Sequence, residues 1–145
     1  MFKKILVPSD GSKLAHGAAE FAAALAKVHG ASVVGLYVID PFPYIGIGDA
    51  SAAGLQAYMG EAQAAADRAL GDIQGCCEAQ GVAFAADTIE RNSTYEGILE
   101  TAQDEGCDLI VMGSHGRTGV KALILGSVAQ KVLTYAKVPV LIVKP

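Results

Sequence analysis

The sequence has no excess of positive charge and no long hydrophobic run. Its 11 basic and 15 acidic residues give the 145-residue chain a net charge of −4. This charge argues against a sequence-independent nucleic-acid binder, because such proteins need a basic surface to neutralise phosphates. The longest apolar runs, such as residues 21–26, reach about six residues, whereas a membrane-spanning helix needs about 18. We therefore expect no nucleic-acid partner and no membrane segment.

The sequence has only three cysteines, and their spacing matches no known cysteine motif. Cys76, Cys77 and Cys107 are odd in number and include an adjacent pair, so they form neither a disulfide framework nor a paired zinc-binding motif. Core-filling thiols in a reducing compartment are the simplest interpretation, and a redox role for the vicinal pair is the alternative. Residues 1–4 carry the charge that begins a secretory signal, but Pro8 interrupts the apolar run that follows. These features favour a cytoplasmic protein.

Length and composition predict a single domain over residues 1–145. The chain has the length of one ordinary domain, and it is 52% apolar and 18% charged, which favours compact folding. Strands are expected over residues 4–7, 32–39, 82–90, 109–112 and 140–143, and helices over 14–28, 55–77, 94–102 and 128–136. Five strands alternating with four helices predict a doubly wound α/β domain, with a five-stranded parallel sheet and helices on both faces.

The pattern makes a prediction for the first helix and leaves one segment open. In the first helix, Leu14, Ala18, Phe21, Leu25 and Val28 recur at helical spacing and are expected to form the buried face. Residues 42–47, by contrast, are rich in proline, glycine and aromatic residues and show no periodicity. A lid over a bound ligand, part of an interface and a simple loop remain open for this segment.

The most informative stretch follows the fourth predicted strand. It reads Gly113-Ser114-His115-Gly116, then nine residues (117–125), then Gly126-Ser127 and a helix. Glycines leave backbone N–H groups accessible, and a helix N-terminus adds further donors and the positive end of the helix dipole. These are the elements of a phosphate-binding loop. The alternative is that the glycines only make tight turns and that Ser127 only caps the helix.

Other phosphate-binding motifs do not match. The P-loop form G-x-x-x-x-G-K-[ST] is excluded because no Gly-Lys pair occurs in the chain. Asp10, just after the first strand, is a candidate to accept a hydrogen bond from a ribose hydroxyl or to hold a divalent metal. Its alternative role is to cap the first helix, for which Ser12 is equally suited.

The pattern G-x-x-G, nine residues, G-S resembles the nucleotide-binding motif of the universal stress protein family, in the subgroup that binds ATP. Pro8-Ser9-Asp10 and residues 138–143 also resemble that family, and the resemblance spans essentially the whole chain. It implies the strand order 3-2-1-4-5, which makes strands 1 and 4 neighbours at the switch point where ligands bind. It also implies a homodimer through the last strand, Val140 to Val143, which this order leaves at a sheet edge.

The resemblance further implies an ATP site with Mg²⁺ or Mn²⁺ near the phosphates. The backbone around Val38 would meet the adenine, and Pro8 would shape the same pocket. Arg117 and Lys121 either add positive charge near a triphosphate or are solvated surface residues. The predicted nucleotide contacts are Pro8, Ser9, Asp10, Val38, Met112, Gly113, Gly116, Arg117, Gly126, Ser127 and Val128, with Asp10 also a metal ligand through the phosphates.

No catalytic apparatus accompanies this loop in the sequence. Rapid phosphoryl transfer needs a positioned lysine, metal ligands and a base. His115 lies in no G-x-S-x-G elbow, and His16 and His29 share no metal-ligand spacing. We therefore expect an ATP-binding regulatory protein of the stress response with an unknown client and at most slow ATP hydrolysis. The alternatives are an ATP-dependent enzyme that uses the same site and a nucleotide-independent dimeric interaction module.

Overall fold

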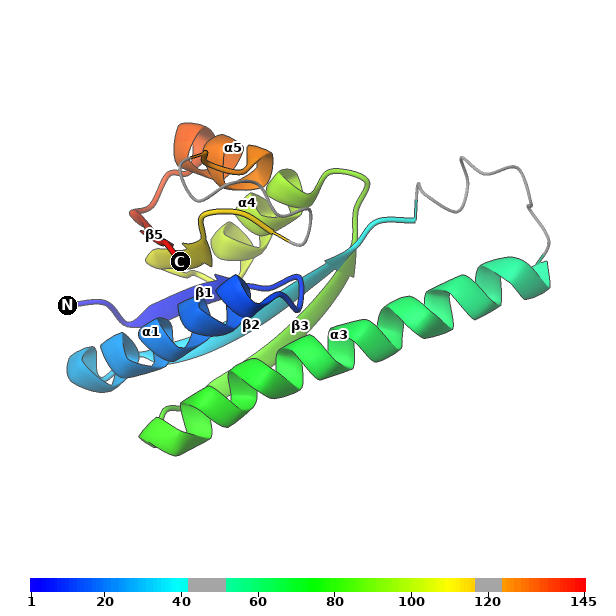
Figure 1. Cartoon of the computed structure of the whole chain (residues 1–145). Helices are drawn as coiled ribbons and strands as arrows, with labels where there is room; N and C mark the ends of the chain where they lie inside the picture. The colour runs from blue at the N-terminus through cyan, green and yellow to red at the C-terminus, as the bar shows by residue number, and fades with distance from the viewer. Residues whose placement is uncertain (42–51, 117–123) are drawn as a thin grey trace.

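The protein is built around one five-stranded parallel sheet, here in a computed structural model that describes residues 1–41, 52–116 and 124–145. The strands lie in the order β3-β2-β1-β4-β5 (Figure 1), as the resemblance implied. Ile5 of β1 pairs with Val33 of β2 on one side and with Leu109 of β4 on the other. The strands are β1 (Lys4–Pro8), β2 (Ser32–Ile39), β3 (Phe84–Glu90), β4 (Leu109–Gly113) and β5 (Val140–Val143).

Helices cover both faces of the sheet, which confirms the predicted α/β fold class. They are α1 (Lys13–His29), α3 (Ala52–Gln80), α4 (Thr94–Asp104) and α5 (Ser127–Tyr135). Side chains of α1 and α3 pack with Ile5 and Val7 of β1 in one apolar cluster. Side chains of α4 and α5 pack with Leu6 in a second cluster on the opposite face. Because both faces are covered, the central strands β1, β2 and β4 read as nearly continuous apolar runs, whereas the edge strand β3 is only partly buried.

The buried face of α1 differs from the predicted one. Val28 and Phe21 are 81% and 46% exposed, so the prediction is wrong for these two residues, whereas Ala18 is buried as predicted and Leu25 is partly buried against the core. Methyl side chains allow α1 to lie close to the sheet and to α3, and the larger side chains are left at its margin. The buried positions are all alanines: Ala15, Ala18, Ala19, Ala22, Ala23 and Ala26.

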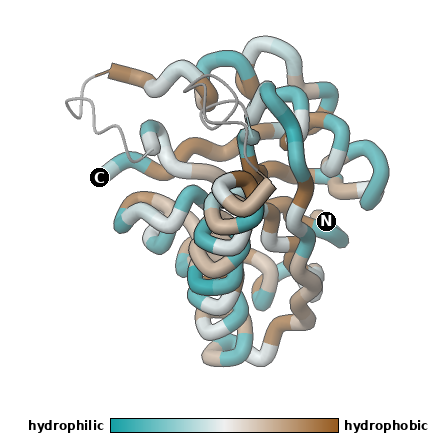
Figure 2. Tube along the Cα trace, turned by 90° about the vertical axis from the view of Figure 1, so that its right-hand side faces the viewer, coloured by the Kyte–Doolittle hydropathy of each residue, from teal (hydrophilic) through white to brown (hydrophobic). Residues whose placement is uncertain are grey.

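The long helix α3 reaches well beyond the sheet. It spans 29 residues, and its first turns project away from the rest of the molecule (Figure 1). Figure 2 looks along this helix and shows hydrophilic and weakly hydrophobic positions intermixed around it. Its buried residues are Ala66, Ala69, Leu70, Ile73 and Cys77, whereas Leu55, expected on the same face, is 40% exposed. Neither α3 nor any other described helix has the combination of length and apolarity needed to cross a bilayer.

The three cysteines are free thiols. Cys77 and Cys107 are buried, and burial raises the pKa of each thiol to about 11. Both thiols are therefore protonated at neutral pH and are poor nucleophiles. The interpretation as core-filling residues fits these two, while Cys76 is only partly buried.

Candidate functional site at the switch point

A cavity of about 790 Å³ lies at the carboxyl ends of the central strands. Its wall includes Pro8 at the end of β1, Val38 and Ile39 at the end of β2, and Gly113 at the end of β4. Small-molecule pockets usually measure about 300–1,000 Å³. The position next to β1, where the strand order reverses, is the place at which open α/β sheets bind ligands. The cavity therefore has the size and the location of a ligand site.

The turn after β1 is held by its own side chains. The Ser9 hydroxyl accepts a hydrogen bond of 3.0 Å from the Gly11 N–H, and Asp10 Oδ1 accepts one of 3.0 Å from the Ser12 N–H. Ser12 then caps α1, because its hydroxyl accepts from the Ala15 N–H at 3.2 Å. The capping role that was open for Asp10 thus belongs to Ser12, and Asp10 lines the cavity.

The glycine-rich loop is tightly packed at both of its ends. A Cβ atom added to Gly116 would collide with the Asp10 carboxylate, and one added to Gly126 would lie 2.9 Å from the His115 Cα atom. A side chain at residue 116 would thus displace the Asp10 side chain, whereas one at residue 126 would require a shift of the backbone. The loop and the turn after β1, which are far apart in sequence, are therefore in contact at the cavity.

Ser114, inside the same loop, is anchored by its backbone but not by its side chain. Its N–H donates to the Val143 carbonyl oxygen at 3.0 Å, and its own carbonyl oxygen accepts from the Gly126 N–H at 2.7 Å. The side chain is 3% exposed, and its hydroxyl has no hydrogen-bond partner among the described residues. This hydroxyl is thus a buried polar group without compensation in the described chain.

The N-terminus of α5 supplies a row of donors to the cavity. Gly126 is the N-cap residue, and its carbonyl oxygen accepts the helical bond from the Gln130 N–H at 2.9 Å. The N–H groups of Ser127, Val128 and Ala129 consequently have no acceptor within the helix. All three residues line the cavity. A helix N-terminus with such donors, at the positive end of the helix dipole, is suited to an anion.

The far wall of the cavity comes from residues that the sequence analysis did not select. Tyr58 of α3 donates a hydrogen bond of 2.8 Å from its hydroxyl to the carbonyl oxygen of Asp40, after β2. Thr94 and Ile98 of α4 also line the cavity. These side chains belong to helices whose position over the sheet has no local signature, so no motif could have found them.

The cavity brings together ten of the eleven predicted contacts: Pro8, Ser9, Asp10, Val38, Met112, Gly113, Gly116, Gly126, Ser127 and Val128. The eleventh, Arg117, lies outside the described residues, as do Lys121 and residues 42–47. His115 also lines the cavity, with its Nδ1 atom 3.4 Å from the Gly116 carbonyl oxygen. The described lining contains Asp10 and Asp40 but no lysine or arginine.

Comparison with known proteins places the chain in a family. The model of the universal stress protein family matches residues 1–144. The chain belongs to the universal stress protein family. A universal stress protein of Methanocaldococcus jannaschii is 37% identical over 145 residues, which cover 99% of this chain and 83% of that protein. A universal stress protein of Thermus aquaticus is 36% identical, and the alignment covers 99% of this chain and 100% of that protein.

Solved structures of the family share the fold. The structure of the M. jannaschii protein MJ0577 superposes with a TM-score of 0.85 at 31% identity, over 100% of this chain and 97% of that one. Two other universal stress proteins were solved with nucleotides. One is in complex with cAMP, at 22% identity and a TM-score of 0.72. The other, from Archaeoglobus fulgidus, is in complex with dAMP, at 24% identity and a TM-score of 0.66. At these identities the likeness concerns the fold alone.

Proposed function

We propose that this universal stress protein binds ATP, together with Mg²⁺ or Mn²⁺, in the switch-point cavity and acts as a nucleotide-dependent regulator of a stress response. The observation that carries the proposal is the N-terminus of α5. Its first N–H groups have no acceptor inside the helix, and the residues that bear them line the cavity beside Gly116 and Gly126. A phosphate chain is the ligand group that best matches these donors.

The layout of the cavity supports a nucleotide rather than a small anion. β1 lies between β2 and β4, so the ends of β2 and β4 are about 10 Å apart. In our proposal the adenine lies against Val38 of β2, the ribose lies near Asp10 after β1, and the phosphates lie between Gly113 and the start of α5. A nucleotide placed in this way spans the cavity from the end of β2 to the end of β4, whereas a lone phosphate would occupy only one end of it.

The charges of the lining support a metal-bound nucleotide. Asp10 and Asp40 both line the cavity, and two carboxylates would repel a triphosphate at close range. A divalent cation bound to the phosphates offsets this repulsion and takes oxygen ligands such as those of Asp10. The donor set of a carboxylate together with phosphate oxygens fits Mg²⁺ or Mn²⁺. Arg117 and Lys121 are proposed to add positive charge to the same region.

Two members of the family with the same fold were solved with adenine nucleotides. Their overall likeness to this chain is one of fold, so they support the proposal by analogy only. The regulatory role, as opposed to rapid catalysis, rests on the sequence pattern, in which the phosphate-binding loop is recognisable but no motif for a base that activates a nucleophile accompanies it. A steady-state ATP hydrolysis rate above about one per second, ordinary for enzymes, would favour the enzyme alternative instead.

Calorimetric titration of the nucleotide-stripped chain with ATP and MgCl₂ tests the proposal. We expect one site of about micromolar affinity, which corresponds to about 8 kcal/mol. Ser127→Ala removes a hydroxyl at the N-terminus of α5 and is expected to weaken binding roughly tenfold, because a hydrogen bond to a charged group contributes about 1.5–3 kcal/mol. Thr134→Ala is the matched control, since it removes an exposed hydroxyl near the other end of the same helix.

The outcomes separate the candidate functions. Loss of affinity in Ser127→Ala but not in Thr134→Ala, with both variants folded by circular dichroism, would support the nucleotide site. Absence of ATP binding by the folded wild-type chain would contradict it and favour the nucleotide-independent interaction module. Repeating the titration with excess chelator tests the divalent cation, whose removal is expected to weaken binding.

We also propose that two copies pair along β5. This strand is at the edge of the sheet, and all four of its residues are only partly buried in the single chain. An uncovered apolar edge strand tends to pair with another chain, and a two-fold axis would cover both edges at once. Light scattering at tens of micromolar is expected to give the mass of a dimer, and a monomer at that concentration would contradict the pairing.

A further inference from the structure

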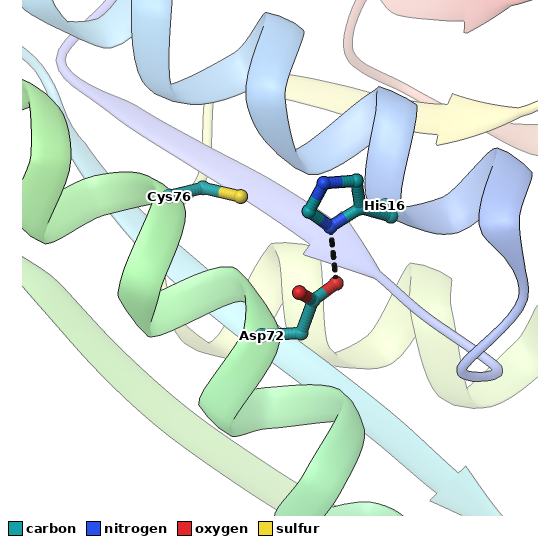
Figure 3. A group of neighbouring side chains, drawn as sticks. All are labelled: His16, Asp72 and Cys76. Carbon is teal, nitrogen blue, oxygen red and sulfur yellow. Dashed lines mark hydrogen bonds and ion pairs between the residues drawn. The ribbon is translucent and has the colours of Figure 1, made fainter.

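A cluster of metal-ligating side chains lies outside the cavity, between α1 and α3. His16 projects from α1, and Asp72 and Cys76 project from α3 toward it (Figure 3). Asp72 and Cys76 are four residues apart, so they share one face of their helix. One imidazole, one carboxylate and one thiol therefore meet at the contact between two helices.

The geometry of the cluster is compact. His16 Nδ1 lies 2.6 Å from Asp72 Oδ2, and the ligating atoms of the three residues all lie within 4.8 Å of one another. On the other side of the ring, His16 Nε2 lies 3.4 Å from Glu20 Oε1. Without a metal, the His16–Asp72 pair links the two helices, and the hydrogen bond that His16 donates to the Asp72 carboxylate raises the pKa of His16.

We propose that His16, Asp72 and Cys76 bind a divalent transition-metal ion, with Zn²⁺ the best match, as a clip between α1 and α3. Imidazole nitrogen, carboxylate oxygen and thiolate sulfur are the three ligand types that zinc accepts in proteins. Three protein ligands leave a fourth tetrahedral position for water. The aspartate and the thiolate together balance the charge of the ion.

Rotations of the three side chains admit the ion, because their ligating atoms already lie within 4.8 Å of one another. At zinc bond lengths of about 2.0–2.3 Å and tetrahedral angles, neighbouring ligand atoms lie roughly 3.4–3.6 Å apart. His16 Nδ1 and Asp72 Oδ2, now 2.6 Å apart, would separate by less than about 1 Å to reach that spacing. The side chains of His16 and Asp72 are 44% and 45% exposed, so they can rotate and an ion can enter from solvent.

Glu20 has the position of a residue that orients the histidine. Metal-bound histidines usually donate their other ring N–H to a carboxylate, which fixes the tautomer and the direction of the ring. Glu20 is one turn after His16 on α1, and its carboxylate faces Nε2. Once the ion has displaced the proton from Nδ1, a proton kept on Nε2 by Glu20 leaves the Nδ1 lone pair directed toward the ion between Asp72 and Cys76. If His16 and Asp72 served only as an ion pair between α1 and α3, neither Glu20 nor Cys76 would be needed beside them.

Cobalt titration of the full-length, nucleotide-free and reduced chain tests the site. Co²⁺ is used as the probe because its bond to a thiolate gives a charge-transfer absorption that bonds to nitrogen or oxygen do not. We expect the band to saturate at one equivalent and to disappear on addition of Zn²⁺. Cys76→Ser is expected to abolish it, and His16→Gln and Asp72→Asn to weaken the affinity at least tenfold. Glu20→Gln is expected to weaken it about tenfold through the loss of ring orientation.

Two of the three matched controls come from the same helices, and the third is a buried cysteine elsewhere. His29→Gln on α1, Asp67→Asn on α3 and Cys107→Ala remove the same residue types elsewhere and are expected to leave the band and the affinity unchanged. A band that persists in Cys76→Ser, or equal affinities in ligand and control variants, would overturn the proposal, as would the absence of a saturable band in the wild type. Because no nucleotide is present, the result is independent of the proposed ATP site.

Discussion

The backbone N–H of Gly126 donates a hydrogen bond of 2.7 Å to the carbonyl oxygen of Ser114. This bond joins the two ends of the glycine-rich loop, so that the chain leaves β4 and returns to the start of α5 at nearly the same point. The approach is so close that residue 126 has no room for a side chain, because its Cβ atom would lie 2.9 Å from the His115 Cα atom and 3.1 Å from the Ser114 oxygen.

Gly126→Ala is therefore expected to displace the loop. Overpacking against backbone usually lowers the free energy of unfolding by about 1–3 kcal/mol, and the shift would also move the N-terminus of α5 away from a bound phosphate. We expect weaker ATP binding by calorimetry and a lower midpoint in urea. Gly75→Ala is the control, because Gly75 has nothing within 4 Å of its Cβ position and alanine favours a helix interior by about 0.5–1 kcal/mol. Unchanged ATP affinity in Gly126→Ala would contradict this account.

Ser114→Ala is expected to leave stability unchanged or to raise it slightly. The Ser114 hydroxyl is buried without a partner among the described residues, and removing an unsatisfied polar group relieves its desolvation. Thr101→Val gives the contrast, since the buried Thr101 hydroxyl donates a hydrogen bond of 2.8 Å to the Gly97 carbonyl oxygen. That variant is expected to lose about 0.5–1.5 kcal/mol. Equal losses in the two variants, measured by urea unfolding, would show that the Ser114 hydroxyl is satisfied after all.

Asp108 is expected to make stability depend on pH in the acid range. Desolvation alone would raise the pKa of its carboxyl group, but the backbone N–H groups of Lys3 and Lys4 donate to it at 2.9 and 3.1 Å, and the net pKa is lowered. Its stabilisation is therefore fully present above the unfolded-state pKa of about 3.9 and is lost as the pH falls through the lower folded-state pKa.

Asp108→Asn is expected to reduce the free energy of unfolding at pH 7, with the deficit shrinking as the pH falls below about 4. Urea titrations of both proteins at pH 7, 5 and 3 measure this difference. Asp104→Asn, an exposed change at the end of α4, serves as the control and is expected to have little effect at any of these pH values. A deficit that is equal at pH 7 and pH 3 would rule out the ionised carboxylate as its cause.

The alanine face of α1 is expected to tolerate no enlargement. Ala22 is 0% exposed in a closely packed interface, so Ala22→Val is expected to lower the free energy of unfolding by about 1–3 kcal/mol. Val28→Ala, by contrast, changes a side chain that is 81% exposed and is expected to stay within about 0.5 kcal/mol of the wild type. If Val28→Ala were the more damaging change in thermal unfolding, the face predicted from sequence periodicity would be the correct one.

The fold could be predicted from the sequence because four strands are short apolar runs, β3 has an alternating pattern, and helix ends are marked by residues such as Ser12 or Gly30. The strand order could not be derived from that pattern, and it came from the resemblance of the glycine motif. The buried face of α1 was predicted correctly at Ala18 but wrongly at Phe21 and Val28, because large residues dominate a periodicity count whereas alanines make the contact.

In the candidate site, too, some residues could be predicted from the sequence and others could not. Gly116 and Gly126 could be selected because their spacing is local in the chain, and Asp10 because it follows a strand that the resemblance places beside β4. Tyr58 could not be selected, since its place in the cavity wall depends on how far α3 extends over the sheet. His16 and Asp72 were missed for a similar reason, because a search for local metal-ligand spacing cannot pair side chains that only helix packing brings together.

The overhang of α3 creates a gradient of local stability along a single helix. At 1.5 Å per residue its 29 residues extend over about 44 Å, yet the buried positions begin only at Ala66. Amide hydrogens near Ile73 should thus exchange with solvent only through global unfolding. Those before Tyr58 should exchange through fraying of the helix end, which has a low free energy of opening. Tyr58 and Ala62 line the cavity, so a ligand bound there would restrain the N-terminal part of α3. Amide hydrogens in that part of the helix would then exchange more slowly when the cavity is occupied.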